Sequence, residues 1–239
     1  MKNVITFRLW TKNIDNLLKV LKYLFAQGEY FIPKECEFGT LSNDDYIPFN
    51  MELLDTSIKD AINSDEVLIL QFLTEDKNRY FHFTVKKGSS YFIKFDIINS
   101  GKPDFIEILV EFYEFISGQL DAIFGFAHDF EDAKNTFASI TVNDIKKIYW
   151  INVFGSELLS MINNYDELNS LSLFSMKKII PEGKASEIAI LRLCESPLDI
   201  LSSRFPILAE DFASILAKNK KIKVDIPVHE TRNLNRPIV

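Results

Sequence analysis

The sequence is informative first for what it lacks. Its 239 residues include only two cysteines, three histidines and eight glycines. Cys36 and Cys194 stand far apart and form no Cys-x-x-Cys pair, so we predict two free thiols rather than a disulfide framework or a thiolate metal site. The P-loop, Gly-x-Gly-x-x-Gly, Gly-x-Ser-x-Gly and His-Glu-x-x-His patterns are all absent. We therefore predict no cofactor, no metal and no catalytic residue.

A long hydrophobic run and an excess of positive charge are also missing. No apolar stretch reaches the roughly 18 residues that a membrane-spanning helix needs, and the opening MKNVITFRLW is too short and too interrupted for a signal peptide. The net charge is -7, which disfavours nucleic acid as a partner because phosphate binding requires a basic face. These features predict a cytoplasmic protein that binds neither a membrane nor nucleic acid.

Hydrophobic and aromatic residues are plentiful. Hydrophobic residues make up 47% of the chain, and 21 of the residues are phenylalanine, so the chain can bury a sizeable core. The charged fraction of 26% is typical of a folded globular protein. We treat residues 1–239 as a single α+β domain, with 1–143 and 144–239 as candidate sub-halves.

The segment Lys146–Ile162 is the centre of this interpretation. Residues 148–154 are apolar or aromatic apart from Asn152, which predicts a strand that is covered on both faces of a sheet. Gly155 ends the run, Ser156 is a suitable helix N-cap, and the leucines that follow have helical spacing. We therefore expect an interior strand followed by a helix that folds back over it.

The remaining periodicity predicts a strand-rich chain with a few amphipathic helices. Strands are expected at 4–10, 67–73, 79–86, 91–98, 122–127, 173–179 and 187–193, and helices at 14–25, 53–61, 105–117 and 198–216. We expect Pro206 to break the last helix into two pieces and 29–50 to be a long irregular connection. This order predicts an α+β fold, a largely antiparallel sheet with helices packed on one side, and possibly related halves.

One cluster has the residue types of a metal site, and the aromatic load allows a ligand pocket. His128, Asp129, Glu131 and Asp132 lie close together in the sequence. They lack the glycine spacing of a calcium loop, so a solvated acidic loop is the favoured interpretation. An uncharacterised enzyme or small-ligand-binding protein with an aromatic-lined pocket is the alternative to a protein-binding function.

The aromatic segment also resembles a known family. It is similar to a hallmark of bacterial polymorphic-toxin immunity proteins, and closest to the immunity protein 52 family, in the run Ile148-Tyr149-Trp150-Ile151-Asn152-Val153-Phe154-Gly155 followed by Glu157-Leu158-Leu159. A second similarity covers residues 188–199, a strand followed by a polar, proline-bearing turn. Ser156 stands where the family usually has proline.

The resemblance implies a protein that is not an enzyme and that binds and neutralises a cognate toxin protein. It implies a fold-specifying role, not a catalytic one, for Tyr149, Trp150, Asn152, Phe154 and Gly155. Trp150 would lie in the core, and Asn152 would satisfy buried backbone groups. Toxin contacts would lie on the outer segments 29–50 and 128–143, where acidic side chains can speed the association of a basic toxin. The candidate partner-binding residues are Asp44, Asp45, Asp129, Glu131 and Asp132.

Overall fold

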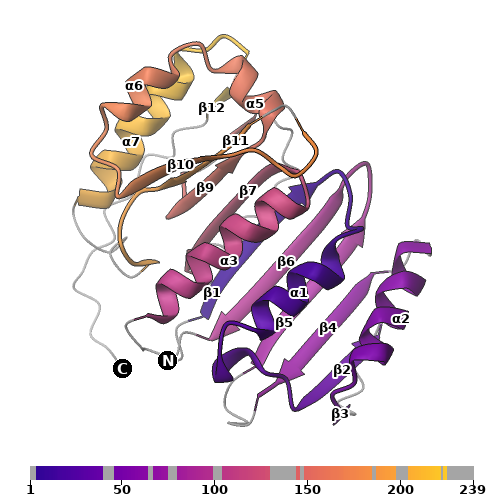
Figure 1. Ribbon diagram of the computed structural model, residues 1–239. Helices are drawn as coiled ribbons and strands as arrows, with labels where there is room; N and C mark the ends of the chain where they lie inside the picture. The colour runs from indigo at the N-terminus through magenta and orange to yellow at the C-terminus, as the bar shows by residue number, and fades with distance from the viewer. Residues whose placement is uncertain are drawn as a thin grey trace, which may run out of the picture.

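The computed structural model describes residues 4–39, 46–63, 67–74, 80–98, 104–129, 144–145, 148–184, 187–197, 204–221 and 223–224. One sheet of ten strands dominates it (Figure 1). The strand order is β10-β11-β9-β7-β1-β6-β5-β4-β2-β3, and every neighbouring pair is antiparallel. The fold is therefore α+β, as the order of elements predicted.

The strands have the following bounds, in chain order. They are β1 (Val4–Thr11), β2 (Glu35–Gly39), β3 (Ile47–Pro48), β4 (Leu68–Leu73), β5 (Tyr80–Lys87), β6 (Tyr91–Ile98), β7 (Ala122–Asp129), β9 (Ile151–Phe154), β10 (Ser175–Ile179) and β11 (Ile188–Arg192). Two further short strands, β8 (Asp144–Ile145) and β12 (Lys223–Val224), pair with each other in parallel.

Three helices cover the first face of the sheet. They are α1 (Leu17–Phe25), α2 (Met51–Asn63) and α3 (Phe105–Gln119), and Figure 1 shows them lying across β1, β6, β5 and β4. Alternate residues of the strands, such as Phe7, Phe83 and Phe95, point toward these helices and share one apolar cluster with Leu21 and Leu109. This alternation follows from the two-residue period of a strand.

The other helices lie on the second face. They are α5 (Ser156–Met161), α6 (Tyr165–Asn169) and α7 (Arg204–Ala217). Their apolar residues form a second cluster with Phe126 and Phe154, which alternate with the first-face residues Ala127 and Val153. The helices are thus divided between the two faces and do not all lie on one side as expected, because β7, β9 and β11 are apolar on both faces and need cover on each.

Most predicted elements form, with two corrections. The stretch 29–50 contains a short 3-10 helix, η1 (Glu29–Phe31), and the strands β2 and β3, so it is not wholly irregular. Pro206 does not break α7, because it is the third residue of that helix, where a missing backbone N–H removes no intrahelical hydrogen bond. Residues 198–203, the first part of the helix expected at 198–216, lie outside the described residues. No helix within the described ranges is long and apolar enough to cross a bilayer.

The predicted interior strand is β9, which pairs with β11 on one side and β7 on the other. Because β9 follows β7 directly in the sheet, the strands of residues 151–192 continue the sheet built by residues 4–129. All four residues of β9 are buried. The strand therefore connects the two apolar clusters through the thickness of the sheet.

Candidate functional site

The aromatic segment is packed into the fold. The indole of Trp150 is fully buried and donates from Nε1 to the carbonyl of Cys194 at 2.8 Å. The ring of Tyr149 stacks on Phe126 with a centroid distance of 3.8 Å. The backbone N–H of Trp150 donates to Nδ1 of His128 at 3.1 Å, so that ring nitrogen is an unprotonated acceptor.

The one polar residue of this segment holds a turn of backbone. The Asn152 side chain accepts a hydrogen bond from the N–H of Tyr149 at 3.0 Å and donates one to the carbonyl of the same residue at 2.8 Å. Both groups are buried, and a buried backbone group without a partner costs about 1–3 kcal/mol. Asn152 therefore fixes the chain where it enters β9.

Gly155 occupies a position with no room for a side chain. Its backbone N–H donates to the carbonyl of Ile123 at 2.9 Å. A Cβ added to Gly155 would lie 2.5 Å from the same carbonyl oxygen and would also collide with the carbonyl of Ala122. Close contact with β7, rather than an unusual φ, therefore requires glycine here.

Four of the predicted partner-binding residues, Asp44, Asp45, Glu131 and Asp132, lie outside the described residues. Asp129 is the last residue of β7, where its backbone pairs with Ile5, and its side chain is also outside the described part. Their role stays a prediction.

The predicted contact segment 29–50 includes β2 and β3 of the sheet, and the segment 128–143 begins with the last two residues of β7. β2 runs in the same direction as β1, whereas β7 runs antiparallel to β1. The ends of β2, at Gly39, and of β7, at Asp129, are therefore at opposite ends of the sheet. The segments that follow them do not leave from one common edge.

Between these ends, the second face of the sheet carries polar side chains in register. One residue from each of six adjacent strands lies on the same line across the sheet. We call this line the polar row, and its residues are Glu37, Gln71, His82, Asp96, Thr6 and His128. The sequence analysis missed it, because alternation assigns a residue to a face but only the register aligns residues of different strands.

Asp96 is the most strongly engaged residue of the polar row. Its Oδ1 accepts from the hydroxyl of Thr6 at 2.6 Å, and its Oδ2 lies 2.6 Å from the ammonium of Lys94. Beside it, the guanidinium of Arg8 lies 5.6 Å from the centre of the Phe126 ring. Burial lowers the pKa of Arg8, and the carboxylate of Asp96 opposes that shift.

His82 lies at the middle of the polar row and is partly buried. Its Nε2 is 3.0 Å from the hydroxyl of Thr84. Burial is the main cause that lowers the pKa of His82, while the nearby carboxylate of Asp96 acts in the opposite direction. A histidine activates a hydroxyl when a carboxylate orients its second nitrogen, but both oxygens of Asp96 are bound to Thr6 and Lys94. The geometry is thus that of a structural hydrogen-bond network.

The described aromatic residues mainly pack against one another. Phe83 stacks on Phe95 at 4.4 Å, and Phe124 and Phe154 lie 6.3 Å apart on the other face. Among the described residues, no group of three or more histidine, cysteine, aspartate or glutamate side chains is placed to hold a metal ion.

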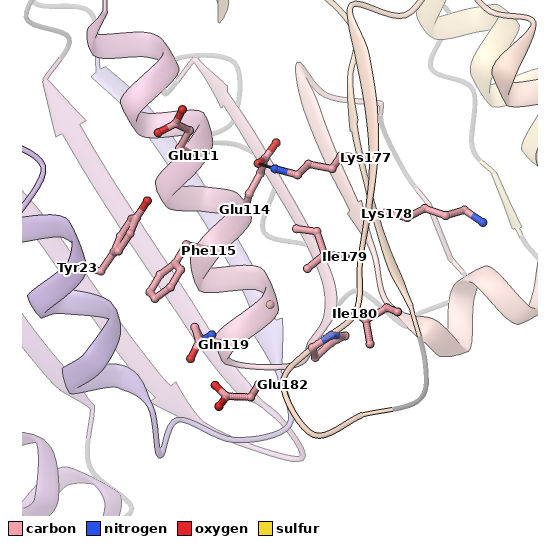
Figure 2. Close-up of a pocket in the computed structure, with 12 residues that line it drawn as sticks. Tyr23, Glu111, Glu114, Phe115, Gln119, Lys177, Lys178, Ile179, Ile180 and Glu182 are labelled. Carbon is pink, nitrogen blue, oxygen red and sulfur yellow. Dashed lines mark hydrogen bonds and ion pairs between the residues drawn. The ribbon is translucent and has the colours of Figure 1, made fainter.

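A groove separates α3 from the edge strand β10 (Figure 2). Its volume is about 630 Å³. Tyr23 and Phe115 stack at 3.9 Å along one side, and Ile179 of β10 lies on the other. Glu111, Glu114, Gln119 and Glu182 supply polar atoms along it. The sequence analysis named no residue of this groove as a candidate site.

Comparisons with known proteins support the fold. No protein-family model matches the chain, so membership of the immunity protein 52 family stays a prediction. No curated protein matches the chain either. Among solved structures, the chain is similar to the "Pseudomonas aeruginosa T6SS protein PA0821", with a TM-score of 0.57 and 12% identity over 92% of this chain and 73% of the other. At this identity, the likeness shows a shared fold.

Proposed function

We propose that this protein is an immunity protein, not an enzyme, that binds a cognate bacterial toxin and neutralises it. The observation that carries the proposal is the likeness of nearly the whole fold to a T6SS protein. The resemblance of residues 148–155 to the toxin-immunity hallmark points to the same class independently of that structure.

The role of the hallmark residues supports this proposal. The side chains of Trp150 and Asn152 are engaged by neighbouring backbone within the fold, and Gly155 is enclosed by β7. A segment with such contacts specifies a scaffold and leaves recognition to the surface. Surfaces that recognise different toxins can then vary while the scaffold is kept.

The experiment is co-expression with the toxin encoded by the neighbouring gene. We expect the protein to restore growth of cells that produce this toxin, and to co-purify with it. An unrelated toxin serves as the control and should not be neutralised. Continued growth arrest together with the absence of a complex would contradict the proposal. Fractionation of the rescued cells tests the associated expectation that the protein acts in the cytoplasm.

A further inference from the structure

Three glutamates form a stripe along α3. Glu107, Glu111 and Glu114 are four and three residues apart, so they project from the same side of the helix. Two of them already bind cations from the sheet. The carboxylate of Glu107 accepts hydrogen bonds from both terminal nitrogens of Arg192, at 2.7 and 2.9 Å. Glu114 forms an ion pair with Lys177 of β10.

Glu111 is the middle residue of the stripe and lines the groove between α3 and β10. It is exposed, and within the described part of the chain no lysine or arginine forms an ion pair with it. Figure 2 shows Glu111 beside Glu114 at one end of the groove, with the hydroxyl of Tyr23 pointing toward the same end. The stripe thus offers one carboxylate for an external cation.

The rest of the groove favours a ligand that donates hydrogen bonds. The Oε1 atom of Gln119 is buried and has no hydrogen-bond partner among the described residues. Glu182, farther along the groove, pairs with Lys19 at 3.0 Å. Lys178 pairs with Glu187 instead, and Figure 2 shows it pointing away from the groove. Of the two lysines that line the groove, Lys177 binds Glu114 and Lys178 points away, so neither forms an ion pair with Glu111.

The hydroxyl of Tyr23 lies near the charged groups of the groove. Burial is the main cause that raises its pKa, the carboxylates of Glu111 and Glu114 raise it further, and the ammonium of Lys177 acts in the opposite direction. The stacked rings of Tyr23 and Phe115 form an aromatic wall beside these carboxylates. Aromatic faces attract cations, and the planar guanidinium is especially suited to stacking on them.

The protein itself contains an occupied site of this kind. The guanidinium of Arg192 lies 4.4 Å from the centre of the Phe174 ring and 5.6 Å from that of Trp150 while it binds Glu107. A carboxylate of α3 next to aromatic rings is thus already satisfied by arginine one helical turn before Glu111. The groove has the same combination, the carboxylate of Glu111 beside the rings of Tyr23 and Phe115, but no arginine of the described residues pairs with Glu111.

We propose that the groove between α3 and β10 is a toxin-binding surface that receives an arginine side chain of the toxin. The carboxylate of Glu111 accepts the guanidinium N–H groups, and an outer face of the stacked Tyr23–Phe115 pair packs against the guanidinium plane. The proposal rests on the proposed immunity function and specifies the chemistry of the partner. A volume of about 630 Å³ accommodates one long side chain with parts of its neighbours.

The test measures the Kd of purified full-length protein for the toxin encoded by the neighbouring gene, by titration calorimetry at low and high salt. The test variant is Glu111→Lys. The matched control is Glu157→Lys, which makes the same charge change at an exposed glutamate of α5 on the second face. We expect Glu111→Lys to weaken binding by about tenfold or more and to reduce its salt dependence, whereas the control stays within about twofold.

The outcomes separate the two proposals. If the wild-type protein binds the toxin and the Glu111→Lys variant binds it with the same Kd, the groove is not the binding surface. The proposed immunity function would then still stand. A wild-type protein that does not bind would overturn both. Thermal unfolding of each variant identifies a misfolded protein, and Glu111→Gln, which keeps the side-chain shape, should then still bind more weakly than the wild type.

Discussion

At the scale of single residues, the structure assigns a physical role to the polar side-chain groups of Trp150 and Asn152. Trp150 combines complete burial of a large ring with a satisfied indole N–H, which is the usual condition for a buried tryptophan. Asn152 is a buried polar residue, and its side-chain amide forms hydrogen bonds with two backbone groups that would otherwise be unsatisfied. Both residues stabilise the same turn into β9.

Removing the Trp150 side chain should therefore be costly. We expect Trp150→Ala to lower the free energy of unfolding by about 3–5 kcal/mol, because it leaves a large cavity and removes the shorter of the two hydrogen bonds to the carbonyl of Cys194. Urea denaturation followed by circular dichroism measures this change. Ile207→Ala is the control, since Ile207 is 62% exposed and should change stability by less than about 0.5 kcal/mol. Equal stability of Trp150→Ala and the wild type would place the ring outside the core.

At the scale of elements, the junction between β9 and α5 is set by its approach to β7. The backbone of Gly155 hydrogen-bonds to Ile123, and α5 begins at the next residue. The glycine thus lets the helix start close enough to β7 to fold back across the second face. A side chain at this position would push two elements apart rather than strain one backbone angle.

Adding a single methyl group at Gly155 should therefore lower the stability of the protein. Gly155→Ala should destabilise the protein by about 1–3 kcal/mol, because the backbone carbonyls of β7 cannot move aside easily. Gly88→Ala is the matched control: its added Cβ would meet only Ser90 O, at an ordinary 3.5 Å. Both variants reduce the flexibility of the unfolded chain similarly, so the difference between their melting temperatures isolates the contact with β7. A Gly155→Ala protein as stable as Gly88→Ala would contradict this account.

At the scale of the whole molecule, one sheet presents two chemically different surfaces. Its first face is an apolar layer under α1, α2 and α3. Its second face carries an apolar cluster under α5, α6 and α7, and that cluster contains no buried residue of β6, β5, β4 or β2. On those strands the second face carries the polar row beside a few apolar side chains, such as Phe92, whose ring lies 4.9 Å from that of Trp10. The overall stability of the fold is therefore coupled to pH through this face.

His82 sets the direction of that coupling. Its pKa is lowered in the folded protein, mainly by burial, so the unfolded chain binds the proton more tightly. The stabilisation is complete above the ordinary histidine pKa of about 6.5 and is lost as the pH falls through the lower folded pKa. We expect the free energy of unfolding to fall between about pH 7.5 and pH 5, and His82→Gln to reduce the size of this fall. Parallel denaturation series at several pH values measure it, and identical pH profiles would show that His82 does not contribute.

Much of the element content could be predicted from local pattern. The strands at 91–98 and 122–127 and the helix at 105–117 are found with nearly the expected bounds, because alternation and helical spacing are local properties. The strand β2 was not predicted, since Pro33 and Gly39 made its surroundings look irregular. The uninterrupted helix through Pro206 depends on where that helix begins, which periodicity locates poorly.

The candidate sites also include features that local sequence patterns predict and features that depend on the tertiary structure. The sequence alone determined that Asn152 and Gly155 belong to a buried strand and its end, because an apolar run closed by glycine has few other structural solutions; Trp150 is buried as expected but lies just before β9, not in it. Only the tertiary structure decided that Glu37, His82 and Asp96 lie on one line, and that Glu111 lines a groove against β10. The physical reason is that strand register and helix placement join residues far apart in the chain, and no local periodicity carries that information.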